Sequence, residues 1–167
     1  MKQTTLAFAF VMATAGIAQA GGQEGTIGVG AEYMNVGVGA PGGDLGGASL
    51  NYDAGAFHVG GFLGFADGGG DDDTAFSIGG RFYYHVHSSA MADFGIGGAL
   101  GIVSADAGPD DRSTFMGLDA GFQIRAFLNP NVAISVTAGL GLGAIDADGI
   151  AIGGQVNGAA GVHYYFY

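Results

Sequence analysis

The chain contains no cysteine and no tryptophan, and only four of its 167 residues are lysine or arginine. Without cysteine, neither disulfide bonds nor thiolate metal sites can hold the fold. The net charge is −11, with 15 acidic residues, whereas nucleic-acid binding requires clustered basic side chains. We therefore expect no nucleic-acid partner. Glycine pairs that imitate nucleotide-binding fragments precede no helical pattern, so we expect no cofactor either.

One stretch without charge, residues 126–145, is long enough to suggest a transmembrane helix. Asn129-Pro130-Asn131 interrupts it, and the remainder alternates β-branched residues with glycine, which disfavours a helix. From Val132 to Gly143, large apolar residues alternate with small or polar ones. A period of two predicts a β-strand with one apolar face.

The first 20 residues differ from the rest of the chain. Lys2 precedes an apolar run, and Ala18-Gln19-Ala20 follows as a small-residue cleavage site. This pattern predicts a secretory signal peptide over residues 1–20 and leaves a single mature domain over residues 21–167.

The period of two recurs along the mature chain and predicts eight strands, at 26–38, 47–53, 57–65, 76–86, 93–102, 115–127, 132–143 and 150–167. The connections alternate between longer breaks, at 39–46, 66–74, 104–113 and 145–149, and tight turns, at 54–55, 87–90 and 128–131. The longer breaks carry ten of the 15 acidic residues: Asp44, Asp67, Asp71, Asp72, Asp73, Asp106, Asp110, Asp111, Asp146 and Asp148. An up-and-down arrangement therefore has acidic loops at one end, with tight turns and both termini at the other.

These features predict an all-β fold, a transmembrane up-and-down antiparallel β-barrel of eight strands. Strands of about 10 residues with an apolar outer face suit a tilted crossing of lipid, and closure satisfies every backbone group. The 36 glycines weaken strands, but at inward positions they make room for large side chains in a narrow barrel. The inward side chains that need this room are Met34, Phe62, Tyr83, Phe115 and Phe127. A soluble β-sandwich is the alternative.

The chain resembles the small eight-stranded outer-membrane barrels, a group that includes OmpA-like domains and opacity-type surface proteins. The turn 127–132 and the aromatic ending 161–167 carry the resemblance. It implies location in a Gram-negative outer membrane, contact with outer-membrane lipid, and assembly by the barrel-assembly machinery through the C-terminal aromatic strand. The family's terminal signature places Tyr167, Tyr165 and His163 towards lipid, whereas strand polarity places Phe166, Tyr164 and Val162 there.

Charged residues at inward positions form the first candidate site: Glu32, Asp53, Arg81, Asp93, Asp119 and Arg125. An enclosed charge is costly unless it is paired, so two arginines among four acids predict an ion-paired plug. A narrow aqueous path for solutes is the alternative, although eight strands leave little lumen.

The acidic loops form the second candidate site, with possible cation contacts at Asp71, Asp72, Asp73, Asp146 and Asp148. Calcium takes several carboxylate oxygens, but the spacing lacks the twelve-residue loop that ends in glutamate. Solvated loop charge is the simpler interpretation.

A third pattern, His85, His87, Ser88 and Ser89, suggests a lipid hydrolase that uses a histidine and a serine. We place it at a periplasmic turn without a carboxylate to orient the histidine, and so expect no enzyme. The expected function is a structural or surface-interaction role through acidic extracellular loops, with an unknown ligand. A narrow pore is the first alternative, and a lipid-modifying enzyme is the second.

Overall fold

The computed structural model describes residues 23–35, 44–69, 74–108, 111–145, 149–152 and 159–166. Its strands are β1 (Thr26–Asn35), β2 (Asp44–Asp53), β3 (Phe57–Asp67), β4 (Thr74–Ser88), β5 (Ala92–Gly108), β6 (Asp111–Asn129), β7 (Val132–Ile145), β8 (Gly149–Ile152) and β9 (Ala159–Phe166). No helix in these ranges has the length and apolar character needed to cross a membrane.

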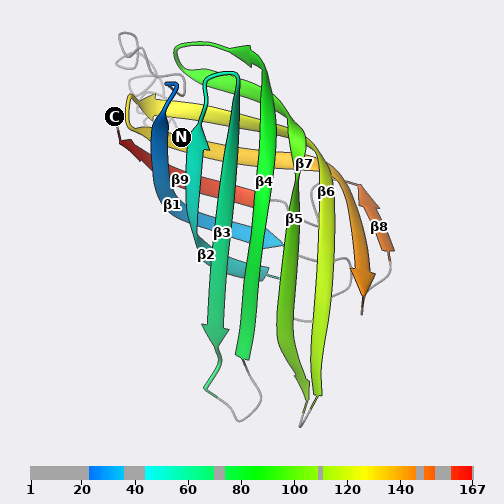
Figure 1. Cartoon of the computed structure of the whole chain (residues 1–167). Coiled ribbons are helices and arrows are strands. Elements are labelled where there is room, and N and C mark those ends of the chain that lie inside the picture. The colour runs from blue at the N-terminus through cyan, green and yellow to red at the C-terminus, as the bar shows by residue number, and fades with distance from the viewer. Residues whose placement is uncertain are drawn as a thin grey trace, which may run out of the picture.

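The strands close into a barrel of eight antiparallel strands, which Figure 1 shows as a tilted cylinder. β1 to β7 pair in chain order, and β9 pairs with both β7 and β1. The register places Ile27 opposite Phe166, so β1 begins and β9 ends at the end of the tight turns. The predicted fold and strand number are confirmed.

The eighth strand differs from the single strand predicted over 150–167. β8 pairs with β7 at Leu140–Gly143, and β9 pairs with β7 at Val132–Val136, so both segments belong to one position in the barrel. On β7 the step from Val136 to Leu140 is four positions, whereas on the other side the step from Ile152 to Ala160 is eight positions. The chain therefore holds four more residues than the ladder needs, which an unbroken strand cannot accommodate.

Several strands also extend into predicted breaks. β5 and β6 together take up most of the predicted break at 104–113, because Asp106 pairs with Arg112 and Gly108 with Asp111 in a continuing hairpin. β2 begins at Asp44, and β3 ends at Asp67. Acidic residues expected in loops thus stand on strands, where the ladder continues because its backbone hydrogen bonds do not depend on apolar side chains.

The two faces of the barrel wall have opposite character. Large apolar side chains point outward from β1 to β7 and from β9, as at Leu50 (54% exposed), Phe65 (68%) and Phe166 (53%). The inward positions hold buried polar and charged residues with a few aromatic ones. At the C-terminal strand, Val162 and Tyr164 are exposed while His163 and Tyr165 are buried, so the outcome follows strand polarity and not the family's terminal signature.

Glycine supplies the room for the large inward side chains. Tyr165 stands opposite Gly28, Arg81 opposite Gly60, and Tyr83 opposite Gly97, each on a neighbouring strand. A Cβ atom built on Gly28 lies 2.8 Å from Cε1 of Tyr165. The expected role of inward glycine holds for Phe62, which Gly79 faces, and for Tyr83. Phe115 and Phe127 are also buried, but they stand opposite Val103 and Ala133 in the ladder, and the side chain of Met34 lies outside the described part.

Candidate functional site

The lumen contains all six of the charged residues that inward parity selected. Glu32, Asp53, Arg81, Asp93, Asp119 and Arg125 are each no more than 8% exposed. The structure brings five of them into two ion-paired clusters, which we call the middle cluster and the turn-end cluster. Asp119 belongs to neither, and within the described ranges no hydrogen bond or ion pair involves it.

The middle cluster joins β1, β2, β4 and β9 across the lumen. The guanidinium of Arg81 donates to both carboxylate oxygens of Glu32, and its Nη1–Oε2 distance is 2.7 Å. Nη2 also donates to Oδ1 of Asn51 at 2.8 Å. A paired guanidinium and carboxylate with further hydrogen bonds is the arrangement in which buried charge is tolerated.

His163 brings a serine and a carboxylate together in the same cluster. Its Nε2 lies 2.6 Å from Oγ of Ser49 and 2.9 Å from Oε1 of Glu32. A hydrolytic triad requires the serine on one ring nitrogen and the carboxylate on the other, so that the carboxylate holds the proton acceptor in place. Here a single nitrogen serves both contacts, and the geometry is that of a structural hydrogen-bond network.

The turn-end cluster is centred on Arg125 of β6. Nη2 of this residue lies 2.7 Å from Oδ2 of Asp53, 2.6 Å from Oδ2 of Asp93 and 3.0 Å from Nε2 of His85. Nη1 donates to the hydroxyl of Tyr165 at 3.1 Å. Asp93 stands directly opposite Arg125 in the ladder, whereas Asp53 belongs to β2, which does not pair with β6.

The β2–β3 turn positions two members of this cluster. Gly55 has φ of +79°, a conformation that favours glycine, and its N–H donates to Oδ1 of Asp53 at 2.9 Å. Its carbonyl oxygen lies 2.7 Å from Nδ1 of His85. Because a carbonyl only accepts, Nδ1 carries the proton, and neutral His85 presents the Nε2 lone pair to Arg125. A register shift between His85 and His87 bends β4 at this point.

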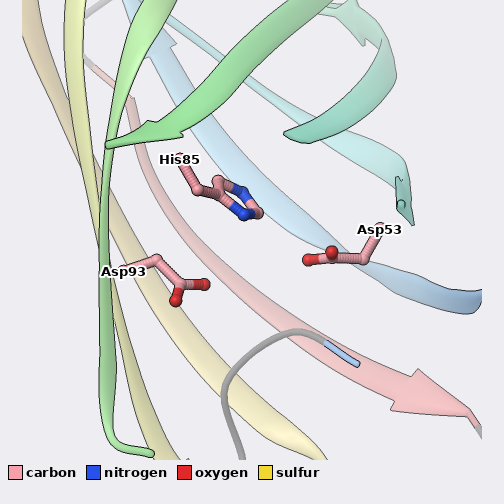
Figure 2. A group of neighbouring side chains, drawn as sticks. All are labelled: Asp53, His85 and Asp93. Atoms are coloured by element: carbon pink, nitrogen blue, oxygen red, sulfur yellow. The ribbon is translucent and has the colours of Figure 1, made fainter. Parts of the chain in front are cut away.

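The expectation that no carboxylate lies beside His85 is wrong. His85 does face carboxylates, since Asp53 and Asp93 lie beside it in the lumen (Figure 2). The hydroxyls do not join it: Oγ of Ser89 accepts from the N–H of Ala92 at 3.0 Å and closes the turn, and His87 and Ser88 are exposed. Neither Ser88 nor Ser89 therefore offers its hydroxyl to His85.

The expected loop cation contacts are not described. Asp71, Asp72, Asp73, Asp146 and Asp148 lie outside the residues for which the structure has a placement.

At the loop end, a cluster of half-buried Thr74 and Asp106 with exposed Arg112 joins β4 to the β5–β6 hairpin. Oδ2 of Asp106 accepts from both the hydroxyl and the N–H of Thr74, the latter at 2.8 Å. Oδ1 pairs with Nη2 of Arg112 at 2.9 Å. These side chains lie beyond the apolar outer band of β5 and β6, which ends near Ile102 and Leu118.

These contacts make the link between β4 and the β5–β6 hairpin sensitive to acid. The hydrogen bonds from Thr74, and then Arg112, hold the pKa of Asp106 below its ordinary value of 3.8. Stabilisation by the ionised carboxylate is therefore present above about pH 3.8 and is lost as the pH falls through the lower pKa of the folded protein. We expect an NMR titration of the Asp106 carboxyl to have its midpoint below 3.8, and Thr74→Val to raise it. An unchanged midpoint in the variant would contradict the assignment of this hydrogen bond.

Inward parity would also have identified several polar residues that were left out of the predicted network. His58, His163 and Asn51 are buried, and His58 places Nδ1 2.8 Å from Nε2 of His85. Asn51 shares the parity of Asp53 on β2, and His58 and His163 alternate with the exposed Val59 and Val162. Alternation indicates which side chains enter the lumen, but it does not indicate which of them contact one another there.

Comparison with known proteins supports the fold. No family model and no curated protein matches the chain. The N-terminal β-barrel domain of Pseudomonas aeruginosa OprF matches with a TM-score of 0.58 and 14% identity, over 87% of this chain and 99% of that chain. Ail of Yersinia pestis matches with a TM-score of 0.46 and 15% identity, over 86% of this chain and 100% of that chain. Neisserial surface protein A matches with a TM-score of 0.47 and 19% identity, over 84% and 96%. The chain has the fold of the eight-stranded outer-membrane β-barrels.

Proposed function

We propose that the chain is an integral barrel of a Gram-negative outer membrane, with a sealed lumen and a structural or surface-interaction role through its acidic loop end. The polarity of the wall carries this proposal. Apolar side chains cover the outside while charged ones fill the inside, the reverse of a water-soluble barrel with an apolar interior. An apolar surface that surrounds the molecule is far larger than a soluble monomer normally exposes.

The two ion-paired clusters support a sealed lumen. The middle cluster spans it through Arg81 and Glu32, and the turn-end cluster spans it through Arg125 and Asp53. A buried apolar group lies beside the turn-end cluster and consists of Phe127, Ala133 and Tyr165. Ions would have to break these contacts to pass.

The loop end supports the surface role by its charge. Asp67 and Asp111 are exposed there, and the predicted acidic loops extend from the same strand ends. Export by the predicted signal peptide and assembly through the aromatic C-terminal strand belong to the same proposal.

A gel experiment tests the membrane location. We expect the protein in isolated outer membranes to migrate differently with and without boiling, because a closed barrel resists unfolding by detergent until it is heated. Recovery in the soluble fraction, without a mobility shift, would instead favour a secreted β-sandwich.

A narrow cation path is the second candidate. Asp119 favours it, because this residue is 3% exposed and lacks an ion-pair partner among the described residues. We expect wild-type barrels in planar bilayers to remain closed. Steady channel openings whose conductance changes when Arg81 or Asp119 is replaced would contradict a sealed lumen and support the pore.

A further inference from the structure

The side chains around Nη2 of Arg125 have the composition of a metal site. Asp53, His85 and Asp93 each offer one ligand atom, and these atoms all lie within 4.8 Å of one another. The three residues belong to β2, β4 and β5, and Figure 2 shows their side chains directed towards the space between them. Two carboxylate oxygens and one imidazole nitrogen form a ligand set that suits Zn²⁺ and related divalent ions.

Arg125 occupies the centre of this group. Its Nη2 is 2.6 to 3.0 Å from all three ligand atoms. An Nη nitrogen has two N–H groups, so Nη2 cannot donate to all three atoms at once, and Nε2 of His85 also lies 2.8 Å from Nδ1 of His58. A metal ion would use all three lone pairs at once.

Other contacts orient the ligands as they are oriented in metal sites. His85 donates its other ring N–H to the carbonyl of Gly55, which directs Nε2 into the group. Asp53 uses Oδ1 to accept from the N–H of Gly55 and leaves Oδ2 for the centre. Outer hydrogen bonds of this kind fix the ring and the carboxylate of metal ligands.

Two observations indicate that the arginine alone does not satisfy the group. Oδ1 of Asp93 and Nε of Arg125 are buried without a hydrogen-bond partner among the described residues. Ionised Asp53 and Asp93 together with Arg125 sum to one negative charge, which is expensive in a buried cluster. A divalent cation would neutralise both carboxylates.

We propose that Asp53, His85 and Asp93 form a divalent transition-metal site of the zinc type at the turn end of the lumen, for which Arg125 is the resident competitor. His85 is only half-buried, so the ion enters from the turn end as the guanidinium withdraws. Tetrahedral Zn²⁺ with bonds of about 2.0–2.1 Å spaces its ligands about 3.3 Å apart, so the side chains draw inward on binding. The inference depends on the closed barrel but not on the proposed surface role.

Zinc titration of the refolded full barrel tests the proposal. The protein carries no histidine tag, the buffer contains no chelator, and calorimetry measures Zn²⁺ binding to wild type and to Arg125→Met. We expect one Zn²⁺ per Arg125→Met barrel, bound at least about 100-fold more tightly than by wild type, since the competing cation is gone. Adding His85→Ala to that variant should weaken binding at least about tenfold.

Arg81→Met is the matched control. It removes the other luminal arginine but leaves one carboxylate and one imidazole, those of Glu32 and His163, with neutral Asn51 and Ser49 beside them, so we expect no tighter Zn²⁺ binding than in wild type. Equal affinity of wild type and Arg125→Met, or a tight site that survives His85→Ala, would overturn the proposal.

The proposal can still be tested if Arg125→Met fails to refold. Refolding that requires Zn²⁺, seen as a heat-modifiable band only when zinc is present, supports the site. If the variant does not refold in either condition, Zn²⁺ binding is measured on wild type and on the single variant His85→Ala. Weak binding by wild type that His85→Ala abolishes supports the site. Binding that is absent from wild type, or unchanged in His85→Ala, overturns it.

Discussion

Replacing Arg125 with methionine in metal-free buffer is expected to lower the free energy of unfolding by about 3–5 kcal/mol. Methionine keeps an unbranched apolar stem but removes the guanidinium and its charge. Asp53 and Asp93, which are 0% and 3% exposed, then face each other without a cation. The loss comes mainly from the two uncompensated carboxylates and not from lost packing.

Reversible urea unfolding of the barrel in phospholipid vesicles measures this effect. The companion variant Asp53→Asn, Asp93→Asn, Arg125→Met removes the charge on all three side chains and should regain most of the stability. If the triple variant is as unstable as the single one, the loss results from altered shape instead. Arg112→Met is the surface control, because this side chain is 46% exposed in its ion pair with Asp106 and its removal is expected to change the stability little.

Gly60→Ala is expected to destabilise the barrel by about 1–3 kcal/mol, even though alanine is normally the better residue for a strand. A Cβ atom on Gly60 overlaps Oδ1 of Asn51 and lies 2.7 Å from Nε of Arg81. The methyl group therefore displaces the guanidinium that spans the middle cluster. Loss of the hydrogen bond from Arg81 to Asn51 adds to the packing strain.

The adjacent residue supplies the control on the same strand. Gly61 faces outward, and the nearest atom to a Cβ built there is the carbonyl oxygen of Gly79 at 3.6 Å. Gly61→Ala should therefore be neutral or stabilise by up to about 1 kcal/mol, because it restricts the unfolded chain. The free energy of unfolding is measured for both variants. Equal effects at the two positions would refute the idea that Gly60 makes room for the middle cluster.

The proposed metal site and the stability of the apo barrel involve the same three side chains in different ways. In the resting barrel, Arg125 holds Asp53 of β2 and Asp93 of β5 to β6. With Zn²⁺ bound, β2, β4 and β5 would be tied through the metal instead. The stability lost in Arg125→Met should therefore return in part when zinc is added, by mass action.

The amino-acid sequence by itself determined the wall of the barrel. Alternation along strands such as 132–143 decides which residues face outward, because successive side chains point to opposite faces whatever the neighbouring strand is. The alternation of acidic breaks and tight turns predicted an even-stranded up-and-down barrel. The same local argument is wrong where charge predicts a loop, as at Asp106, because a ladder continues through polar residues.

Only the tertiary structure decided which luminal side chains meet. Arg125 and Asp53 are 72 positions apart on strands that do not pair, and they touch because closure and stagger bring β2 and β6 to the same level of the lumen. The turn at Gly55 then orients His85 towards the same point. Parity is a property of one strand, whereas these contacts depend on the register of every strand around the barrel, and so the turn-end cluster could not be predicted from alternation alone.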